Sequence, residues 1–386
     1  MKIFVEASAM MNQRSGIGQY TKRLLEASAK RDTKNTYTAY FFRFYVSRRP
    51  LNIPIKPRAN FSYRMIRWLP AVLYYQTFKR LFTLPIDVLL GKTPDIMLFP
   101  NFVSWPVLSR KTLVIPVIHD LSFIHFSQHT SPQNLLYMKK FVPKTLQRAD
   151  HVITISENSK REIIEYYGVA EDKISIVNPA IDHADYYPRS VAEITKVRTK
   201  YALPEKYFLF TGTLEPRKNI QGILDAYAGL SEQVRAQYGL VLAGGKGWVD
   251  EDIQTRLDKY HDLSIVLTGY VDDADLPAMF SGATLFLFPS FYEGFGIPPL
   301  EAMACGVPVI SSRNSSLPEV IGEAGVLIDG TNWRAIRDAI VQLVDDPAMR
   351  TKLIKAGLKQ AAKFSWEKSA ADLIELFERL QKQRRG

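Results

Sequence analysis

The pattern of apolar and polar positions predicts strands and helices in alternation along most of the chain. Runs with the length of buried strands occur at residues 2–7, 37–42, 96–99, 113–118, 152–155 and 174–177. Helical patterns separate several of them, as at residues 19–30 and 158–167. The pattern then resumes, with strands expected at residues 207–211, 240–243, 265–268, 285–288, 307–311 and 326–328. Such alternation predicts an α/β fold with mainly parallel sheets covered on both faces.

Two domains are expected, because 386 residues are many for a single hydrophobic core. The segment Asn178–Asp182, followed by Tyr187-Pro188, interrupts the pattern near the midpoint and predicts a hinge. We therefore expect one doubly wound domain over residues 1–183 and a second over residues 184–365. A final helix is expected from Trp366 to Leu380, where apolar side chains recur at helical spacing as a packing stripe.

Composition favours a cytoplasmic protein. Cys305 is the only cysteine, so no intramolecular disulfide is possible, which suits a reducing compartment. The first apolar run leads directly into a strand without the pattern of a signal peptide. No window approaches about 20 uninterrupted apolar residues, so we expect no transmembrane helix.

The net charge of +11 is concentrated in one stretch, residues 33–86, which contains ten bases and no acid. The bases alternate with many aromatic side chains, including Tyr63, Trp68 and Tyr74. This mixture suits adsorption to an anionic membrane or to a lipid-linked substrate. A solvated basic face and a groove for single-stranded nucleic acid are the alternatives that this composition leaves open.

The densest candidate site is the segment from Glu293 to Glu301, which follows an apolar strand. Gly294 and Gly296 permit positive φ and a close approach of the backbone to a ligand, and the two prolines after them suit a first helical turn. A helix start behind a glycine loop favours phosphate or sugar oxygens. Glu293 and Glu301 are expected to hold two different parts of one ligand by accepting hydrogen bonds from its hydroxyls.

Two other strand ends carry candidate residues. His119 and Asp120 follow the strand at residues 113–118, and the ends of parallel strands are where such sheets bind ligands. His119 is therefore a site candidate, with a structural histidine as the alternative, whereas Asp120 is expected to orient its loop. Arg217 and Lys218 lie between a strand and the next helix, where two cations and free N–H groups favour an anion over a plain surface pair.

Other patterns give weaker or structural predictions. Ser156 is expected to cap a helix. Ser15-Gly-Ile-Gly18 is similar to a phosphate loop, but the full dinucleotide fingerprint is missing, which argues against an oxidoreductase that binds NAD. Gly244-Gly-Lys-Gly247 has the wrong spacing for a Walker loop.

Together these blocks resemble the GT-B glycosyltransferases, specifically family 4, and the resemblance covers most of the chain. The similar blocks are Ile118–Asp120, Thr211–Asn219, Gly269–Val271 and Glu293–Gly296 with Glu301. Gly16-Ile-Gly-Gln-Tyr20 and Glu215-Pro-Arg-Lys-Asn219 look closest to bacterial mannosyltransferases that act in O-antigen or other polysaccharide assembly. The chain departs from the family pattern at Thr213, where many members have Arg, and at Ala180, where many have Gly.

The resemblance implies two Rossmann-like domains that face a central cleft, with residues 366–386 crossing back to the N-terminal domain. It implies an acceptor bound by the N-terminal domain, a nucleotide-sugar donor bound by the C-terminal domain, and retention of anomeric configuration without a metal or other cofactor. The implied catalytic residues are His119, Arg217, Lys218 and Glu293. The implied donor-binding residues are Gly16, Tyr270, Val271, Gly294, Phe295, Gly296 and Glu301.

The implied roles divide the donor among these residues. Arg217 and Lys218 would hold the diphosphate, Glu301 the ribose and Glu293 the hydroxyls of the transferred sugar. The backbone at residues 270–271 would meet the base, Gly16 would let the first loop approach the diphosphate, and His119 would face the sugar.

The resulting expectation is transfer of mannose from GDP-mannose to a lipid-linked or oligosaccharide acceptor, by a protein at the inner face of the plasma membrane. Nucleic acid is not expected as a partner. A UDP-sugar or another GDP-sugar is the alternative donor, and a Rossmann oxidoreductase or a nucleic-acid-binding protein is the remoter alternative.

Overall fold

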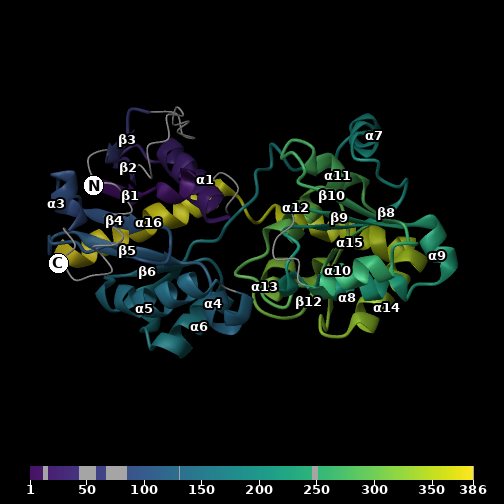
Figure 1. Cartoon of the computed structure of the whole chain (residues 1–386). Helices are drawn as coiled ribbons and strands as arrows, with labels where there is room; N and C mark the ends of the chain where they lie inside the picture. Colours follow the sequence, from purple (N-terminus) through teal and green to yellow (C-terminus); the bar gives the residue numbers. More distant parts are fainter. Residues whose placement is uncertain (12–15, 43–57, 67–84, 130, 246–250, 386) are drawn as a thin grey trace. The chain divides into compact units, whose positions relative to one another are not determined.

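The chain folds into two α/β units (Figure 1), in a computed structural model that describes residues 1–11, 16–42, 58–66, 85–129, 131–245 and 251–385. One unit comprises Met1–Pro179 together with Trp366–Gly386, and the other comprises Ala180–Ser365. The boundary expected from the sequence, between residues 183 and 184, lies a few residues beyond this division. Each unit is described by itself below.

The N-terminal unit is built on a parallel sheet of seven strands, in the order β3-β2-β1-β4-β5-β6-β7. Its central strands are almost entirely buried, as expected for a parallel sheet covered on both faces. The strands are β1 (Lys2–Glu6), β2 (Thr36–Phe42), β3 (Phe61–Ile66), β4 (Ile96–Phe99), β5 (Leu113–Ile118), β6 (Val152–Thr154) and β7 (Ile174–Ile176).

Helices surround this sheet, and the last helix of the chain is one of them (Figure 1). The α-helices are α1 (Gly16–Arg31), α3 (Ile86–Leu90), α4 (Ser122–His125), α5 (Pro132–Arg148), α6 (Glu157–Tyr167) and α16 (Trp366–Arg385). Short 3-10 helices are η1 (Ser8–Met11), η2 (Ser127–His129) and η3 (Glu171–Lys173). Helix α16 packs on α1, and its predicted packing stripe is confirmed, because Trp366, Ala370, Leu373, Phe377 and Leu380 are all buried.

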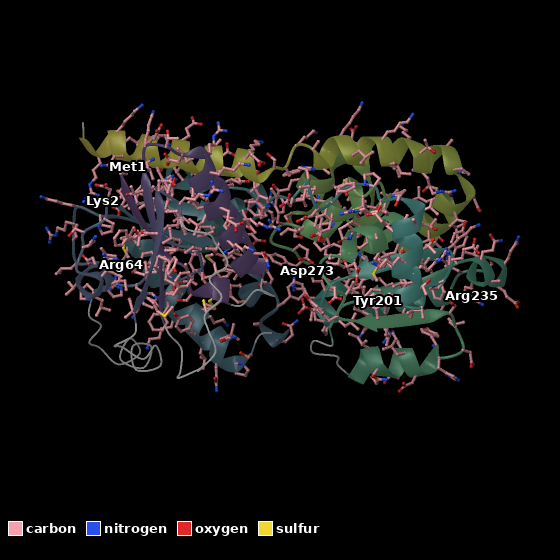
Figure 2. The ribbon with its side chains drawn as sticks, turned by 90° about the horizontal axis from the view of Figure 1, so that it is seen from above. Met1, Lys2, Arg64, Tyr201, Arg235 and Asp273 are labelled. Atoms are coloured by element: carbon pink, nitrogen blue, oxygen red, sulfur yellow. The ribbon has the colours of Figure 1, made fainter. Side chains whose placement is uncertain are left out.

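Strand β3 is an element that the hydrophobic pattern did not predict, because it lies inside the basic, aromatic stretch at residues 33–86. It pairs in parallel with β2 at the edge of the sheet, and Tyr63 on it is exposed. Arg64, labelled in Figure 2, donates from Nη1 to the carbonyl oxygen of Leu90 at 3.3 Å. Most of the other bases of the stretch lie at residues 43–57 and 67–84, outside the described residues.

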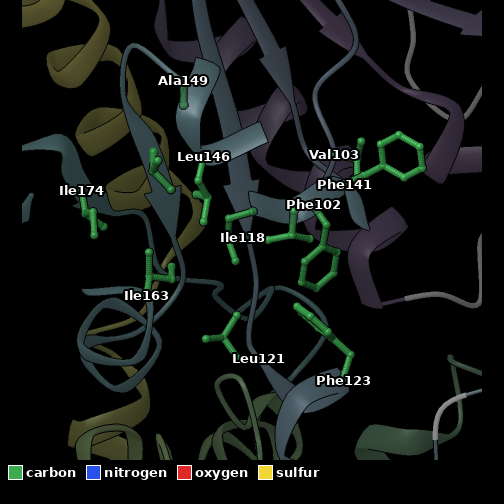
Figure 3. Packing of buried hydrophobic residues seen from close by; sticks show 12 residues of the cluster. Phe102, Val103, Ile118, Leu121, Phe123, Phe141, Leu146, Ala149, Ile163 and Ile174 are labelled. Carbon is green, nitrogen blue, oxygen red and sulfur yellow. The ribbon is translucent and has the colours of Figure 1, made fainter. Parts of the chain in front are cut away.

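A hydrophobic cluster lies around the carboxyl end of β5 (Figure 3). It brings Ile118 and Leu121, which flank His119, together with Phe102 and Phe123. Residues of α5, β6 and α6 complete it, among them Val142, Val152 and Ile163. The loop that carries His119 is therefore anchored on both sides by packed apolar side chains.

The C-terminal unit is built on a second parallel sheet, of six strands in the order β10-β9-β8-β11-β12-β13. The apolar runs predicted all six strands, three with the observed boundaries and three with boundaries that differ by one or two residues. The strands are β8 (Tyr207–Thr211), β9 (Gly239–Ala243), β10 (Ile265–Gly269), β11 (Leu285–Phe288), β12 (Val309–Ser312) and β13 (Val326–Ile328).

The helices of this unit alternate with its strands. They are α7 (Val191–Lys200), α8 (Ile220–Ala228), α9 (Glu232–Gln237), α10 (Glu251–Lys259), α11 (Leu276–Gly282), α12 (Ile297–Ala304), α13 (Leu317–Ile321), α14 (Trp333–Asp345) and α15 (Pro347–Ala361). The 3-10 helices η4 (Pro216–Lys218) and η5 (Gly322–Ala324) complete the set. Among the described residues, no helix is both long enough and apolar enough to cross a membrane.

The chain crosses from one unit to the other twice, after Pro179 and after Ser365. Within the C-terminal unit, the two segments next to these crossings contact each other. Ile181 and Ser365 form an isolated parallel bridge. Nε2 of His183 lies 3.1 Å from the carbonyl oxygen of Phe364. The predicted break at residues 178–182 thus coincides with the first passage.

Candidate active site

Three of the predicted site residues meet at the carboxyl edge of the second sheet. Lys218 Nζ lies 2.5 Å from Oε1 of Glu293, and Arg217 Nη1 lies 3.2 Å from Oε2 of the same carboxylate. The guanidinium also donates to the carbonyl oxygen of Tyr292 and, through Nη2, to Oε1 of Glu215, both at 2.6 Å. Two cations therefore share one buried acid, and a second acid lies at their rim.

The local backbone explains why Arg217 and Lys218 face Glu293. They form the short helix η4, and Asn219 ends it in the left-handed conformation, with φ of 57°. The Asn219 side chain caps α8 by accepting from the N–H of Gly222, and its amide nitrogen reaches the carbonyl oxygens of Pro289 and Gly330. Asn219 thus joins the loops after β8, β11 and β13, which places η4 against the Glu293 loop.

The electrostatics of the cluster favour the ionised form of Glu293, whereas burial lowers the pKa of Lys218. Burial would raise the pKa of the Glu293 carboxyl, but the charges of Lys218 and Arg217 and the hydrogen bond from Lys218 hold that pKa below its ordinary value. The side chains of Glu293 and Lys218 are only 10% and 12% exposed, so their attraction is weakly screened. In the free protein, the Glu293 carboxylate neutralises part of the positive charge of Arg217 and Lys218, to which an anionic ligand would bind.

The loop that carries Glu293 is fixed by two serines after β12. Ser315 Oγ accepts from the N–H of Glu293 at 3.0 Å. The Ser316 hydroxyl lies 2.8 Å and 2.7 Å from the carbonyl oxygens of Glu293 and Phe295. Sequence reasoning missed both serines, and their only signal was their place at the end of a parallel strand.

Of the two loop glycines, Gly296 uses the positive φ that glycine permits. It has φ of 118° and caps α12, and a Cβ there would lie 2.9 Å from a methyl carbon of Leu317. The φ of Gly294 lies outside the positive region. The two prolines do occupy the first turn of α12, and Phe295 is buried with its ring 5.6 Å from that of Phe364.

Glu301 lies on α12. Burial raises the pKa of the Glu301 carboxyl to about 7, the Tyr186 hydroxyl opposes that rise, and the charge of Asp273 adds to it. After Ser315 and Ser316, Tyr186 is a third residue that the sequence did not indicate.

The segment after β10 contains the predicted base contact. Tyr270 is half exposed, and its hydroxyl lies 3.2 Å from Oδ1 of Asp273, whereas Val271 is buried. Gly269 before them has φ of 66°. The turn therefore presents the tyrosine outward and anchors itself through the valine.

On the N-terminal unit, His119 is buried beside two aromatic rings. Its ring centroid lies 5.2 Å from that of Tyr20 and 5.5 Å from that of Phe102. Nε2 lies 2.7 Å from the carbonyl oxygen of Pro100. Because a carbonyl only accepts, Nε2 carries the proton and Nδ1 is left as the acceptor nitrogen. Burial lowers the pKa of His119, so the ring is neutral.

The other predictions for this unit are structural. The helix expected at residues 19–30 begins three residues earlier, at Gly16, where an added Cβ would meet no described atom within 4 Å. Asp120 Oδ1 accepts from the N–H of Ser122, and Ser156 Oγ accepts from the N–H of Ser159. The expected roles of Asp120 as a loop-orienting residue and of Ser156 as a helix cap are therefore confirmed.

Comparisons with known proteins identify the family and the fold of the chain. Residues 193–360 match the family model "Glycosyl transferases group 1", and residues 14–185 match "Glycosyltransferase Family 4". The O-antigen chain mannosyltransferase B of Escherichia coli is 39% identical over 283 residues, which cover 73% of each chain. The serotype-specific mannosyltransferase WbdA of E. coli is 34% identical over 306 residues, which cover 74% of this chain and 37% of that protein.

Solved structures share the fold along almost the whole chain. Sucrose-phosphate synthase from Thermosynechococcus elongatus superposes with a TM-score of 0.73 at 21% identity and covers 99% of both chains. WaaG, a glycosyltransferase of lipopolysaccharide biosynthesis, superposes with a TM-score of 0.73 at 14% identity, over 98% of this chain and 99% of that one. Anabaena HepE, solved with UDP and glucose, has a TM-score of 0.72 at 16% identity over 98% and 99% of the two chains.

Proposed function

Because this chain belongs to the glycosyltransferases of group 1 and family 4 and has the GT-B fold, we propose that it transfers mannose from GDP-mannose to a lipid-linked or polysaccharide acceptor. The proposal of mannose is supported by two relatives, both named as mannosyltransferases and one as an O-antigen chain enzyme. Assembly of a bacterial cell-surface glycan is the corresponding process. A UDP-sugar is the alternative donor, since HepE, which shares the fold, binds UDP.

The observation that supports transfer from a nucleotide sugar best is the cluster of Arg217, Lys218 and Glu293. When the glycosidic bond of such a donor breaks, negative charge develops on the departing diphosphate. Preorganised cations aimed at that charge stabilise the transition state more than the ground state. We infer that the diphosphate replaces the Glu293 carboxylate as the ionic partner of Arg217 and Lys218. The carboxylate is then available to accept hydrogen bonds from the sugar. These two cations would supply the charge that a metal ion supplies elsewhere.

In this proposal, each of the remaining site residues contacts a different part of the donor. Glu301 accepts hydrogen bonds from the ribose, and the backbone of Tyr270 and Val271 meets the base. The Nδ1 atom of His119 accepts a hydrogen bond from a sugar hydroxyl, a role that suits its neutral ring. Gly16, at the start of α1, lets the first loop approach the diphosphate in this proposal.

We propose retention of the anomeric configuration by front-face attack. The bond from C1 of the sugar to the phosphate oxygen breaks, the acceptor oxygen bonds to C1 on the same face, and the acceptor proton passes to the departing phosphate oxygen. In this proposal Glu293 accepts hydrogen bonds from the sugar hydroxyls and does not attack C1. Positioning of donor and acceptor then supplies much of the rate.

A nucleotide panel tests the donor, because the diphosphate and base contacts do not depend on the acceptor. Purified protein is titrated with GDP, UDP, dTDP and ADP in a thermal-shift assay, followed by transfer assays with the matching sugar donors. We expect GDP to stabilise the protein most and GDP-mannose to be consumed. Preference for UDP would support the alternative donor, and stabilisation by NAD alone would refute the glycosyltransferase site.

Substitutions test the diphosphate contact separately. Arg217→Ala and Lys218→Ala are each expected to lose transfer while the fold survives. Arg337→Ala is the matched control, because Arg337 pairs with Asp338 on α14, outside the cluster. Normal turnover by both site variants would rule out these cations as the diphosphate site.

The proposed location is the cytoplasmic face of the membrane, through the basic stretch at residues 33–86. Sedimentation with anionic liposomes is expected for the wild type and is expected to weaken when Arg64, Arg67, Lys79 and Arg80 are replaced by Glu. Neutral liposomes are the control. Sedimentation that the four substitutions leave unchanged would contradict this location, and a steep salt dependence of RNA or DNA binding would favour a nucleic-acid partner instead.

A further inference from the structure

We propose that Tyr20 is a positioning residue that sets the direction of the His119 ring for the transferred sugar and ties this ring to the segments where the chain crosses between the units. The inference rests on the proposed function, in which Nδ1 of His119 accepts a hydrogen bond from a sugar hydroxyl. Tyr20 lies on α1, one turn after Gly16, and is only 2% exposed. It acts through His119 and has no donor contact of its own in this proposal.

Two hydrogen bonds fix both ends of His119 but leave one rotation of its ring free. The hydroxyl of Ser159 donates to the backbone carbonyl oxygen of His119 at 3.0 Å. At the other end, Nε2 donates to the carbonyl oxygen of Pro100 at 2.7 Å. A ring held only at Cβ and Nε2 can still turn about the line between these atoms, because the torsion that joins such a ring to Cβ is soft. This turn would swing Nδ1 away from a bound sugar hydroxyl.

Tyr20 and Phe102 remove this rotation by packing against the ring. The Tyr20 ring is nearly perpendicular to that of His119, at 86°, with centroids 5.2 Å apart. Phe102, labelled in Figure 3, meets the same ring at 55° with centroids 5.5 Å apart. In a close-packed interior, a turn of the buried imidazole would push it into one of these neighbours. The direction of the Nδ1 lone pair therefore depends on where Tyr20 lies.

The position of Tyr20 is set by the two segments next to the chain crossings. Its hydroxyl donates to the carbonyl oxygen of Val177 at 3.0 Å, close to the first crossing. Its ring centroid lies 6.0 Å from that of Trp366, the first residue after the second crossing, at an angle of 61°. The Ser369 hydroxyl, one turn along α16, donates to the carbonyl oxygen of Asn178 at 2.7 Å and so joins the two segments to each other. Tyr20 therefore contacts both crossing segments as well as the site histidine.

The ring and the hydroxyl of Tyr20 have separable roles in this arrangement. The ring contacts His119, whereas the hydroxyl serves the carbonyl group of Val177, a residue that is 1% exposed. Removing the hydroxyl alone should lower stability, because a buried carbonyl group loses its donor, while the ring continues to hold His119. Removing the ring should release His119. A tyrosine with a purely structural role would show no such separation.

The test measures how much affinity the sugar adds to the nucleotide. Isothermal titration calorimetry without acceptor gives the Kd of GDP and the Kd of GDP-mannose for each variant. The ratio of the first to the second, compared among variants, reports the contacts of the sugar alone. We expect Tyr20→Leu to reduce this ratio about threefold to tenfold, the range for the loss of one hydrogen bond, and to change GDP affinity by less than about twofold. Tyr20→Phe should keep the wild-type ratio but have a lower Tm.

Two reference variants separate positioning from a general structural effect. His119→Ala removes the sugar contact itself and should reduce the ratio at least as much as Tyr20→Leu. Added to His119→Ala, Tyr20→Leu should reduce the ratio no further, because Tyr20 acts through that ring. Tyr37→Leu is the matched control, because Tyr37 is 1% exposed and its hydroxyl donates to Oδ2 of Asp32 at 2.7 Å. It lies at the amino end of β2, the opposite edge of the sheet, so its loss should lower Tm and leave the ratio unchanged.

Trp366→Leu tests the link to the second crossing. If Trp366 holds Tyr20 in place, its loss should also reduce the ratio. Combined with Tyr20→Leu, it should reduce the ratio by less than the product of the two single effects, because both act on the same ring contact. An unchanged ratio in Trp366→Leu, or independent effects of the two substitutions, would refute the link.

The outcomes separate this inference from the proposed function. If the wild type binds neither GDP nor GDP-mannose, the proposed function fails, and if His119→Ala keeps the wild-type ratio, its sugar contact at His119 fails. If His119→Ala reduces the ratio and Tyr20→Leu does not, only the role of Tyr20 is refuted. An equal loss of GDP and GDP-mannose binding in Tyr20→Leu, or a reduced ratio in Tyr37→Leu, would also refute it as an effect on the fold. If Tyr20→Leu does not fold, Tyr20→Met, whose unbranched side chain adapts to the space, takes its place in the same comparison.

Discussion

Replacing Glu293 by Gln is expected to destabilise the free protein and to increase its affinity for the nucleoside diphosphate. The substitution keeps the shape of the side chain but removes the charge that Lys218 Nζ meets at 2.5 Å and Arg217 Nη1 at 3.2 Å. The ion pair between Arg217 and Glu215, at the rim, then remains. An incoming diphosphate no longer competes with the Glu293 carboxylate for them.

The magnitude follows from the burial of the pair. Breaking a buried ion pair typically costs about 3–5 kcal/mol, and the residual exposure of 10–12% places this pair near the lower end, about 3 kcal/mol. For a unit the size of Ala180–Ser365, this corresponds to a fall in Tm of about 6–12 °C. Tighter GDP binding by about tenfold would return about 1.4 kcal/mol at saturating ligand.

The assay is thermal unfolding of wild type, Glu293→Gln and Glu215→Gln, each with and without GDP. Glu215 is the matched control, since it pairs with Arg217 at 2.6 Å but is 27% exposed, so its loss should cost about 1 kcal/mol or less. GDP should raise the Tm of Glu293→Gln more than that of wild type. A smaller GDP effect in Glu293→Gln than in wild type would refute the reasoning that Glu293 and the diphosphate share the same cations.

Transfer and backbone geometry provide further predictions. Glu293→Gln should also slow transfer about tenfold or more, because the variant loses the charged contact to the sugar. During turnover by the wild type, mass spectrometry should find no sugar covalently bound to Glu293. Gly244→Ala should unfold the C-terminal unit or lower its Tm sharply, because a Cβ there would lie 1.9 Å from the carbonyl oxygen of Gly212. Gly245→Ala is the matched variant and should be nearly neutral, because a Cβ there would meet no atom of the described residues within 4 Å. The lowered pKa of His119 means that the unfolded state binds more protons than the native state as the pH falls through about 6.5, so the free energy of unfolding should decrease with falling pH. His119→Gln should lose this part of the pH dependence in urea unfolding. An unchanged dependence would contradict a lowered pKa of His119.

The sequence by itself determined the elements and the chemistry of the site. Buried parallel strands are short apolar runs, so β8 to β13 could be located without any tertiary information. The segment Glu293–Gly296 and the pair Arg217-Lys218 stood out because glycine, proline and charge at strand ends have local physical reasons to be there. Strand β3 was missed because its bases and aromatics conceal the apolar period of an edge strand.

Only the tertiary structure decided which side chains meet. That Glu293 neutralises both cations depends on Asn219 tying three loops together, a contact between residues far apart in the chain. The contacts of Ser315 and Ser316 to the Glu293 loop likewise join separate segments. The raised pKa of Glu301 follows mainly from its burial. A local pattern specifies residue type and backbone preference, whereas burial, pairing and pKa arise only when the sheet brings its loops to one edge.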